Sequence, residues 1–267
     1  MKLTPITNNE IYAEYKAHKF KFIELIGKQP AEKLSTNGET WEMVDHLPDI
    51  AMMIPSPFVV LDFDNRNEAD IIERIIINEN LPYRCMRTDR GLHVWTKSPT
   101  PWTNRTHQKI ALNGFNADIR SYGKLCYVKI RKNGIDRKWT HLVPWDEIGE
   151  CPKWLTIPTN QNIIPNCTGY KNGDGRANAL FKYRGSLIAQ DWSKDDICTL
   201  YRLYNEYIFK DKLTAEEITH LLRDELFIKQ ELPLLKIKTR YGNEKKPAQP
   251  ESEQVYDIDT DLSLIHI

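Results

Sequence analysis

The segment PFVVLDFD (57–64) constrains the fold most strongly, because an apolar, β-branched run ends in two aspartates two positions apart. Val and Phe favour β-structure, and a strand that is buried on both faces has a continuous apolar sequence. Side chains alternate between the faces of a strand, so Asp62 and Asp64 project to one side and Phe63 to the other. The segment therefore predicts a buried strand that carries two carboxylates at its end.

The patterns after this strand predict an α+β (mixed α/β) domain. Residues 67–80 (NEADIIERIIINEN) have apolar side chains at positions 71, 72, 75, 76 and 77, which indicates a helix. Five short strand-like segments follow, separated by Gly, Asn or Pro, as a mostly antiparallel sheet requires. These segments are YRCMRTD (83–89), GLHVWTK (91–97), GFNADIRS (114–121), LCYVKIRK (125–132) and WTHLVPW (139–145).

The chain is expected to continue with a small helical domain. Residues 156–175 contain Pro, Asn and Gly without periodicity, which is typical of a linker between a first domain at 1–155 and a second at 176–235. Within the second domain, helical patterns cover 176–190, 193–209 and 214–228. Ser193 with Asp196, and Thr214 with Glu217, have the spacing of a helix N-terminus, where a hydroxyl precedes an acid by three positions.

The C-terminal part has a different composition. Residues 236–261 contain few large apolar side chains, so we expect a flexible tail or an interdomain linker. The last six residues, LSLIHI (262–267), equal the translation of a sequencing transposon end, CTGTCTCTTATACACATC. We hypothesise that they are adapter sequence and that the natural protein continues past Asp261. Recloning that finds LSLIHI followed by a stop codon would refute this.

Overall composition indicates a cytoplasmic protein. The 267 residues are 40% hydrophobic and include no apolar stretch of 18 residues or more, so no membrane association is expected. The N-terminus has polar residues where a signal peptide has an apolar core. Five cysteines occur without a CxxC pair, so they are expected to be reduced thiols rather than disulfides or zinc ligands.

Charge is distributed unevenly although the formal net charge is zero. Between Leu81 and His141 there are thirteen Lys and Arg against three Asp, a local net charge of +10. Such a block indicates binding to nucleic acid, and a merely solvated basic face is the alternative. Trp95, Trp102 and Tyr122 within it could stack on bases, although packing is the commoner role of any one aromatic residue.

The carboxylate pair suggests a metal site. Asp62 and Asp64 repel each other when ionised, and a divalent cation that prefers oxygen, such as Mg²⁺ or Mn²⁺, relieves that repulsion. The same DxD pattern also occurs in glycosyltransferases, in dehalogenase-type phosphatases and at ordinary strand ends. The residues after Asp64 are NRNE, without the hydroxyl residue that usually follows in the phosphatases.

Two further segments carry side chains suited to the same chemistry. In TDRGLHVWTK, Gly91 permits close backbone approach, and Thr88, Arg90 and His93 can bind phosphate oxygens, although a strand histidine is more often a core residue. In FNADIRSYG, Asp118 is an isolated acid within the basic block. It is either a salt-bridge partner or a third metal ligand.

Together these motifs resemble the archaeo-eukaryotic primase superfamily, in particular its primase-polymerase branch of phages, plasmids and mobile elements. VVLDFD matches the family's hhDhD motif, TDRGLH matches [ST]xxGxH, and ADIRSYG matches the hD motif. The motifs occur in the family's order, with gaps of 29 and 25 residues between Asp64, His93 and Asp118. The resemblance extends from about residue 11 to 230 and includes the helical primase C-terminal type of domain. Asp89 and Arg90 depart from the family, which commonly has small residues there.

The resemblance implies an RRM-like mixed sheet and a DNA primase/polymerase that synthesises or extends primers by two-metal, template-directed nucleotidyl transfer. It assigns Asp62, Asp64 and Asp118 to two Mg²⁺ or Mn²⁺ ions, and His93 to the triphosphate, with help from Thr88, Arg90, Gly91 and Arg120. The implied partners are a single-stranded DNA template, nucleoside triphosphates and a helicase, either as a domain that follows this chain or as a separate protein, in the host cytoplasm. The alternative is a non-catalytic replication initiation module that binds single-stranded nucleic acid.

Overall fold

The computed structural model describes residues 7–33, 38–123 and 125–227 and confirms the α+β class. The described residues up to Arg223 form one compact unit, and the described residues 224–227 belong to a second. The elements are α1 (Asn8–Ala17), β1 (Phe22–Ile26), β2 (Gln29–Pro30), α2 (Trp41–Val44), β3 (Ile50–Met53), β4 (Phe58–Phe63), α3 (Arg66–Asn78), β5 (Arg84–Arg87), β6 (Leu92–Lys97), β7 (Arg105–Lys109), β8 (Asn116–Ser121), β9 (Tyr127–Lys132), β10 (Ile135–Asp136), β11 (Trp139–His141), α4 (Arg176–Ala189), α5 (Lys194–Leu203) and α6 (Ala215–Leu221).

The predicted strand at 57–64 is β4, a central strand of a six-stranded sheet. The strand order is β11-β5-β6-β4-β8-β7, and every pairing is antiparallel. All residues of β4 are buried except Asp62, which is half-buried. The strand is apolar throughout because β6 and β8 pair with its two edges and other parts of the protein pack on both of its faces.

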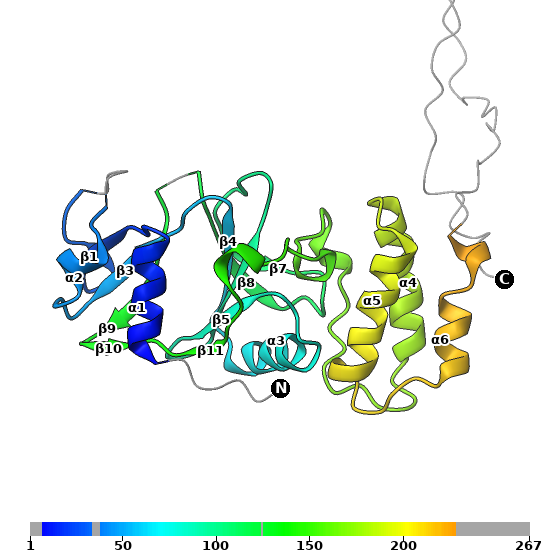
Figure 1. The fold of residues 1–267 in the computed structure, drawn as a ribbon. Helices are drawn as coiled ribbons and strands as arrows, with labels where there is room; N and C mark the ends of the chain where they lie inside the picture. The colour runs from blue at the N-terminus through cyan, green and yellow to red at the C-terminus, as the bar shows by residue number, and fades with distance from the viewer. Residues whose placement is uncertain (1–6, 34–37, 124, 228–267) are drawn as a thin grey trace, which may run out of the picture. The chain divides into compact units, whose positions relative to one another are not determined.

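A second sheet corrects the expectation of one mixed sheet. It has five strands in the order β10-β9-β3-β1-β2, again antiparallel (Figure 1). The predicted strand at 125–132 is β9, and it pairs with β3 rather than with the strands that carry the motifs. Periodicity finds strands but not their partners, because pairing is decided by long-range packing.

The two sheets share one hydrophobic core. Phe58 and Val60 of β4 belong to a buried cluster that also contains Phe22, Met52 and Ile130 of the five-stranded sheet. Asp62 is the next side chain on that face of β4. The apolar part of the strand is thus held between the sheets, and its carboxylate lies at the edge of this core.

Tryptophans complete the core at one end. Trp95 and Trp145 are fully buried, with ring centroids 5.3 Å apart, and the guanidinium of Arg84 lies over the Trp145 ring at 4.2 Å. Glu14 pairs with Arg84 at 2.8 Å, so this buried cation has a counter-charge. Trp95 is therefore a core residue and does not stack on bases.

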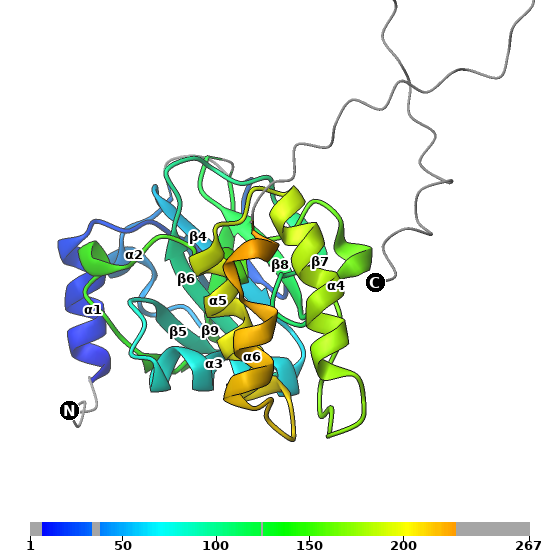
Figure 2. The ribbon, with the colours of Figure 1, turned by 90° about the vertical axis from the view of Figure 1, so that its right-hand side faces the viewer.

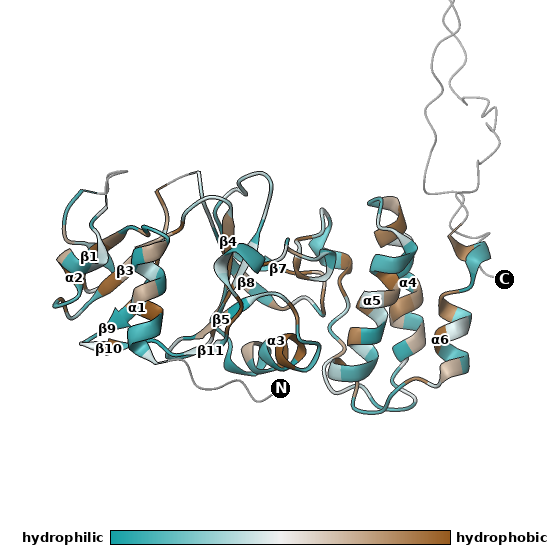
Figure 3. Ribbon diagram, in the orientation of Figure 1, coloured by the Kyte–Doolittle hydropathy of each residue, from teal (hydrophilic) through white to brown (hydrophobic). Residues whose placement is uncertain are grey.

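Helix α3 covers the six-stranded sheet on β4 and β6. Asn65 caps it, because its side-chain oxygen accepts from the backbone N–H groups of Asn67 and Glu68. The helix combines hydrophobic and hydrophilic residues (Figure 3), and of the predicted apolar positions Ile72, Ile75 and Ile76 are buried. Ile77 is 45% exposed, so it is not part of the buried face.

The helical segment after residue 175 contains α4, α5 and α6 (Figure 2). Both predicted helix starts are confirmed as capping boxes, Ser193 with Asp196 and Thr214 with Glu217. Helix α5 ends at Leu203, and a short π-helix continues it over Tyr204–Ile208. The predicted tail at 236–261 and the hexapeptide at 262–267 lie outside the described residues.

Asn113 joins the helical segment to the six-stranded sheet within residues 1–223. This buried residue lies between β7 and β8, and its side chain accepts from the N–H of Cys167 at 2.6 Å and donates to Thr168 at 2.7 Å. Its own N–H donates to the Tyr204 hydroxyl at 2.8 Å.

The assignment of residues 176–235 to a separate helical domain stays a prediction. No helix among the described residues is long and apolar enough to cross a bilayer.

Candidate active site

The strand register brings the predicted site residues into one row. Asp62 on β4 is directly opposite His93 on β6 and directly opposite Asp118 on β8. Residues opposed across antiparallel strands share a face, with Cβ atoms about 4.5–5.5 Å apart. His93 Nε2 lies 3.3 Å from Asp62 Oδ1. Three motifs that are scattered over the sequence therefore meet on the central strand.

Asp64 lies just beyond the end of β4. Its carboxylate is exposed and lies 3.4 Å from the guanidinium of Arg90. Asp62 and Asp64 both line two cavities, one of about 960 Å³ and one of about 420 Å³. The carboxylate pair thus forms part of the boundary of both spaces.

The turn that precedes β6 fits tightly against the end of β4. The Thr88 hydroxyl accepts from the Gly91 N–H at 2.9 Å, and the Thr88 N–H donates to the Gly91 carbonyl at 3.1 Å. A Cβ atom on Gly91 would lie 1.6 Å from the carbonyl oxygen of Phe63. Glycine is required there because the backbone of the turn contacts the backbone beside Asp64.

Asp118 is held by two donors. One is Arg120 Nη2 at 2.9 Å, and the other is the backbone N–H of His107 at 2.8 Å. His107 has φ +52°, and the pairing of β7 with β8 shifts register between Arg105 and Gln108. This bulge turns the His107 N–H toward Asp118. The sequence analysis did not identify His107, because no residue pattern predicts a β-bulge in a polar edge strand.

Electrostatics favour the ionised form of Asp62. Burial of the carboxylate raises its pKa, but His93, Arg120 and Arg137 outweigh this and hold the pKa below its ordinary value. Asp62 is therefore a carboxylate at neutral pH despite its position at the core. An ionised, partly buried carboxylate is the form that a divalent cation binds.

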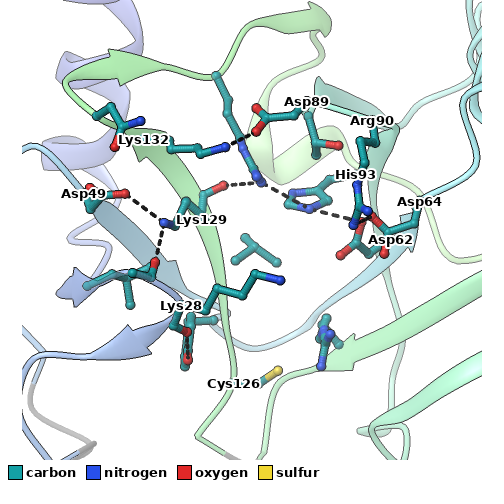
Figure 4. Close-up of a pocket in the computed structure, with 18 of the residues that line it drawn as sticks. Lys28, Asp49, Asp62, Asp64, Asp89, Arg90, His93, Cys126, Lys129 and Lys132 are labelled. Atoms are coloured by element: carbon teal, nitrogen blue, oxygen red, sulfur yellow. Dashed lines mark hydrogen bonds and ion pairs between the residues drawn. The ribbon is translucent and has the colours of Figure 1, made fainter.

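The larger cavity has a cationic wall opposite the carboxylates. Figure 4 shows His93, Asp62 and Asp64 on one side and Lys129, Asp49 and Lys132 on the other. Lys129 is bound by Asp49 at 2.8 Å and by the Gly27 carbonyl at 2.6 Å. This wall therefore carries cations opposite the motif residues, although Lys129 is paired with Asp49 and Lys132 with Asp89.

The basic block does not form a single surface. Arg84 is buried beneath Trp145, Arg87 is bound by Asp70 and Glu73, and Arg131 is bound by Asp136. These cations hold the fold together, so they do not contribute to a phosphate track. The cations that line the larger cavity are Lys28, Arg90, Arg120, Lys129, Lys132 and Arg137.

The acids fit a divalent cation by donor chemistry. Carboxylate oxygens are the donors that Mg²⁺ and Mn²⁺ prefer, and Asp62, Asp64 and Asp118 all line the smaller cavity. Within residues 7–33, 38–123 and 125–227, no group of three or more His, Cys, Asp or Glu side chains is arranged to hold a metal ion. Basic side chains instead contact these carboxylates: His93 contacts Asp62, Arg90 contacts Asp64 and Arg120 contacts Asp118.

Comparison with known families identifies the class. The sequence matches the Prim-Pol model, described as bifunctional DNA primase/polymerase, N-terminal, over residues 15–154. Enzymes of this kind are nucleotidyltransferases, and this chain is one of them. It belongs to the Prim-Pol family of DNA primases/polymerases, since the match covers more than half of its length. No curated protein matches the chain.

Proposed function

We propose that this chain synthesises or extends primers on a single-stranded DNA template by two-metal nucleotidyl transfer. The observation that carries the proposal is the register of Asp62 with both His93 and Asp118, beside a cavity with a cationic wall. Family membership supports the reaction class. It also disfavours the DxD glycosyltransferase alternative, which has no other support here.

In this proposal Asp62, Asp64 and Asp118 hold two Mg²⁺ or Mn²⁺ ions. When bound, the ions supply activation of the attacking 3′-hydroxyl and neutralisation of the triphosphate charge. The protein's part is to keep the acids ionised and aligned. Packing of β4 between two layers fixes Asp62, and Arg120 with the His107 N–H fixes the carboxylate of Asp118.

The nucleotide's triphosphate occupies the larger cavity in this proposal. His93 is 3% exposed and lines this cavity, and in this proposal it binds phosphate and is not a general base. Arg90 and Arg120 line the same space and provide further charge. Thr88 uses its oxygen to accept from Gly91, which leaves its hydroxyl proton free to donate to a phosphate oxygen.

His93→Ala is expected to weaken nucleotide binding. Loss of one charge-assisted hydrogen bond costs roughly 1.5–3 kcal/mol, which corresponds to an increase of about 10- to 100-fold in KM for the nucleotide. The measurement is steady-state incorporation against nucleotide concentration at saturating primer and template, with thermal unfolding as a check on folding. An unchanged nucleotide KM would remove His93 from this role.

The non-catalytic alternative is separated from the enzyme by a mixing experiment. The chain is incubated with a single-stranded circular template, labelled ribo- or deoxynucleotides, and Mg²⁺ or Mn²⁺. Labelled products that disappear on chelation of the metal support the proposal. DNA binding that weakens with salt but gives no products in any mixture supports a replication initiation module instead.

The biological setting follows from the resemblance of the motifs. We place the enzyme in the replication of a phage or plasmid, in the host cytoplasm, with a helicase domain or a separate helicase protein acting after the helical segment. Co-purification of a helicase with the chain from the natural host would support this placement. Location of the gene in a cellular replication operon would contradict it.

A further inference from the structure

Arg137 lies outside the three motifs and reaches the site from the other sheet. It follows β10, and its Nη1 donates to the carbonyl of Lys129 on β9 at 2.8 Å. The same Nη1 lies 3.5 Å from Nε2 of His93 on β6. The guanidinium therefore spans from the five-stranded sheet to the histidine of the six-stranded sheet, at the wall of the larger cavity.

The surroundings of Arg137 leave its charge incompletely compensated. Burial lowers its pKa, against the influence of Asp89, Asp62 and Asp64, which raise it. Among the described residues no carboxylate forms an ion pair with Arg137; Asp89 pairs instead with Lys132, Asp64 with Arg90 and Asp62 with His93. Its Nε is buried without a hydrogen-bond partner, and so is Nδ1 of His93.

Arg137 is half-buried, and a partly buried guanidinium whose Nε has no partner is costly unless an anion binds it. A guanidinium presents its N–H groups in a planar fork that matches two phosphate oxygens, whereas an ammonium binds as a point charge. The adjoining cavity of about 960 Å³ has room for a nucleotide. An anion that binds Arg137 would therefore lie in the same cavity in which the nucleotide is expected.

We propose that Arg137 binds the triphosphate of the incoming nucleotide together with His93. This inference rests on the proposed function and adds a residue from the β10–β11 connection to the nucleotide site. Arg137 thereby joins the two sheets through the substrate. A purely structural bridge between Lys129 and His93 is the competing explanation.

The test compares Arg137→Met and Arg137→Lys with Lys138→Met. Lys138 is the next residue, it is exposed, and it does not line the cavity, so its substitution removes the same charge from the same segment. The dissociation constant of a non-hydrolysable deoxynucleoside triphosphate is measured in Mg²⁺, with nucleotide KM, kcat and thermal unfolding. We expect a rise of about 10- to 100-fold for Arg137→Met, a smaller rise for Arg137→Lys, and less than about 3-fold for Lys138→Met.

The outcomes separate the explanations. If folded Arg137→Lys binds nucleotide as the wild type does and only unfolds at lower temperature, the residue is a structural bridge and the proposal is wrong. An equal loss in Lys138→Met would also overturn it, since diffuse charge would then explain binding. If Arg137→Met does not fold, the result for Arg137→Lys decides. A wild-type chain that incorporates no nucleotide would refute the proposed function itself.

Discussion

Asp62→Asn is expected to reduce nucleotide incorporation by more than about 100-fold while the protein stays folded. Removal of groups that only support metal ligands typically costs 10- to 100-fold, so loss of a ligand carboxylate should cost more. The amide has the same shape and keeps an oxygen opposite His93, so we expect a stability loss of no more than about 2 kcal/mol. Primer extension and thermal unfolding measure the two effects.

Asp70→Asn is the matched control for this substitution. Asp70 is an exposed carboxylate on α3 that pairs with Arg87 at 2.7 Å and lines neither cavity. Its neutralisation changes the net charge equally, and incorporation should stay within about 3-fold of wild type, as is usual for exposed pairs. Asp62→Asn with near-normal incorporation would exclude this carboxylate from metal binding.

Gly91→Ala is expected to damage both stability and activity. The added Cβ would lie 1.6 Å from the Phe63 carbonyl oxygen, which is backbone and cannot rotate away. The turn at 88–91 must then move off the end of β4, at a cost of about 3 kcal/mol or more. For a domain of this size that cost lowers Tm by roughly 6–12 °C. Asp64 and His93 flank this contact, so incorporation should fall as well.

Gly185→Ala is the matched control for Gly91→Ala, and we expect it to raise Tm rather than to lower it. Gly185 lies within α4, and apart from its chain neighbours and the backbone of its own helix no atom lies within 4 Å of the position that its Cβ would take. Alanine in a helix interior is favoured over glycine by roughly 0.5–1 kcal/mol, so Tm should rise slightly. Equal Tm values for Gly91→Ala and Gly185→Ala would show that the tight contact of the turn with Phe63 does not contribute to stability.

The sequence was sufficient to predict the local elements that hold the motifs. β4 and α3 lie where the apolar run and the 3.6-residue periodicity placed them, and the two capping boxes lie at Ser193 and Thr214. These features depend on neighbours along the chain. The motif resemblance also led to the family that the comparison shows, although the matched region ends at residue 154, before the helical segment.

Features that depend on distant partners could not be predicted. The separation into two sheets follows from pairing of β9 with β3, which lie far apart in the sequence. Arg137 was one of thirteen cations, and only the fold shows that it faces His93 while Arg84 is buried under tryptophan. Charge counting therefore found the basic region but could not separate structural cations from those that line the cavity.

The central claim is that Asp62, Asp64 and Asp118 bind divalent cations together. Electron paramagnetic resonance titration with Mn²⁺, in the presence of a non-hydrolysable nucleotide, measures binding without requiring catalysis. Wild type should bind two Mn²⁺ ions per chain, and Asp62→Asn, Asp64→Asn and Asp118→Asn should each lose at least one of them, whereas Asp70→Asn should bind as wild type. Wild-type Mn²⁺ stoichiometry in all three substituted proteins would contradict the account.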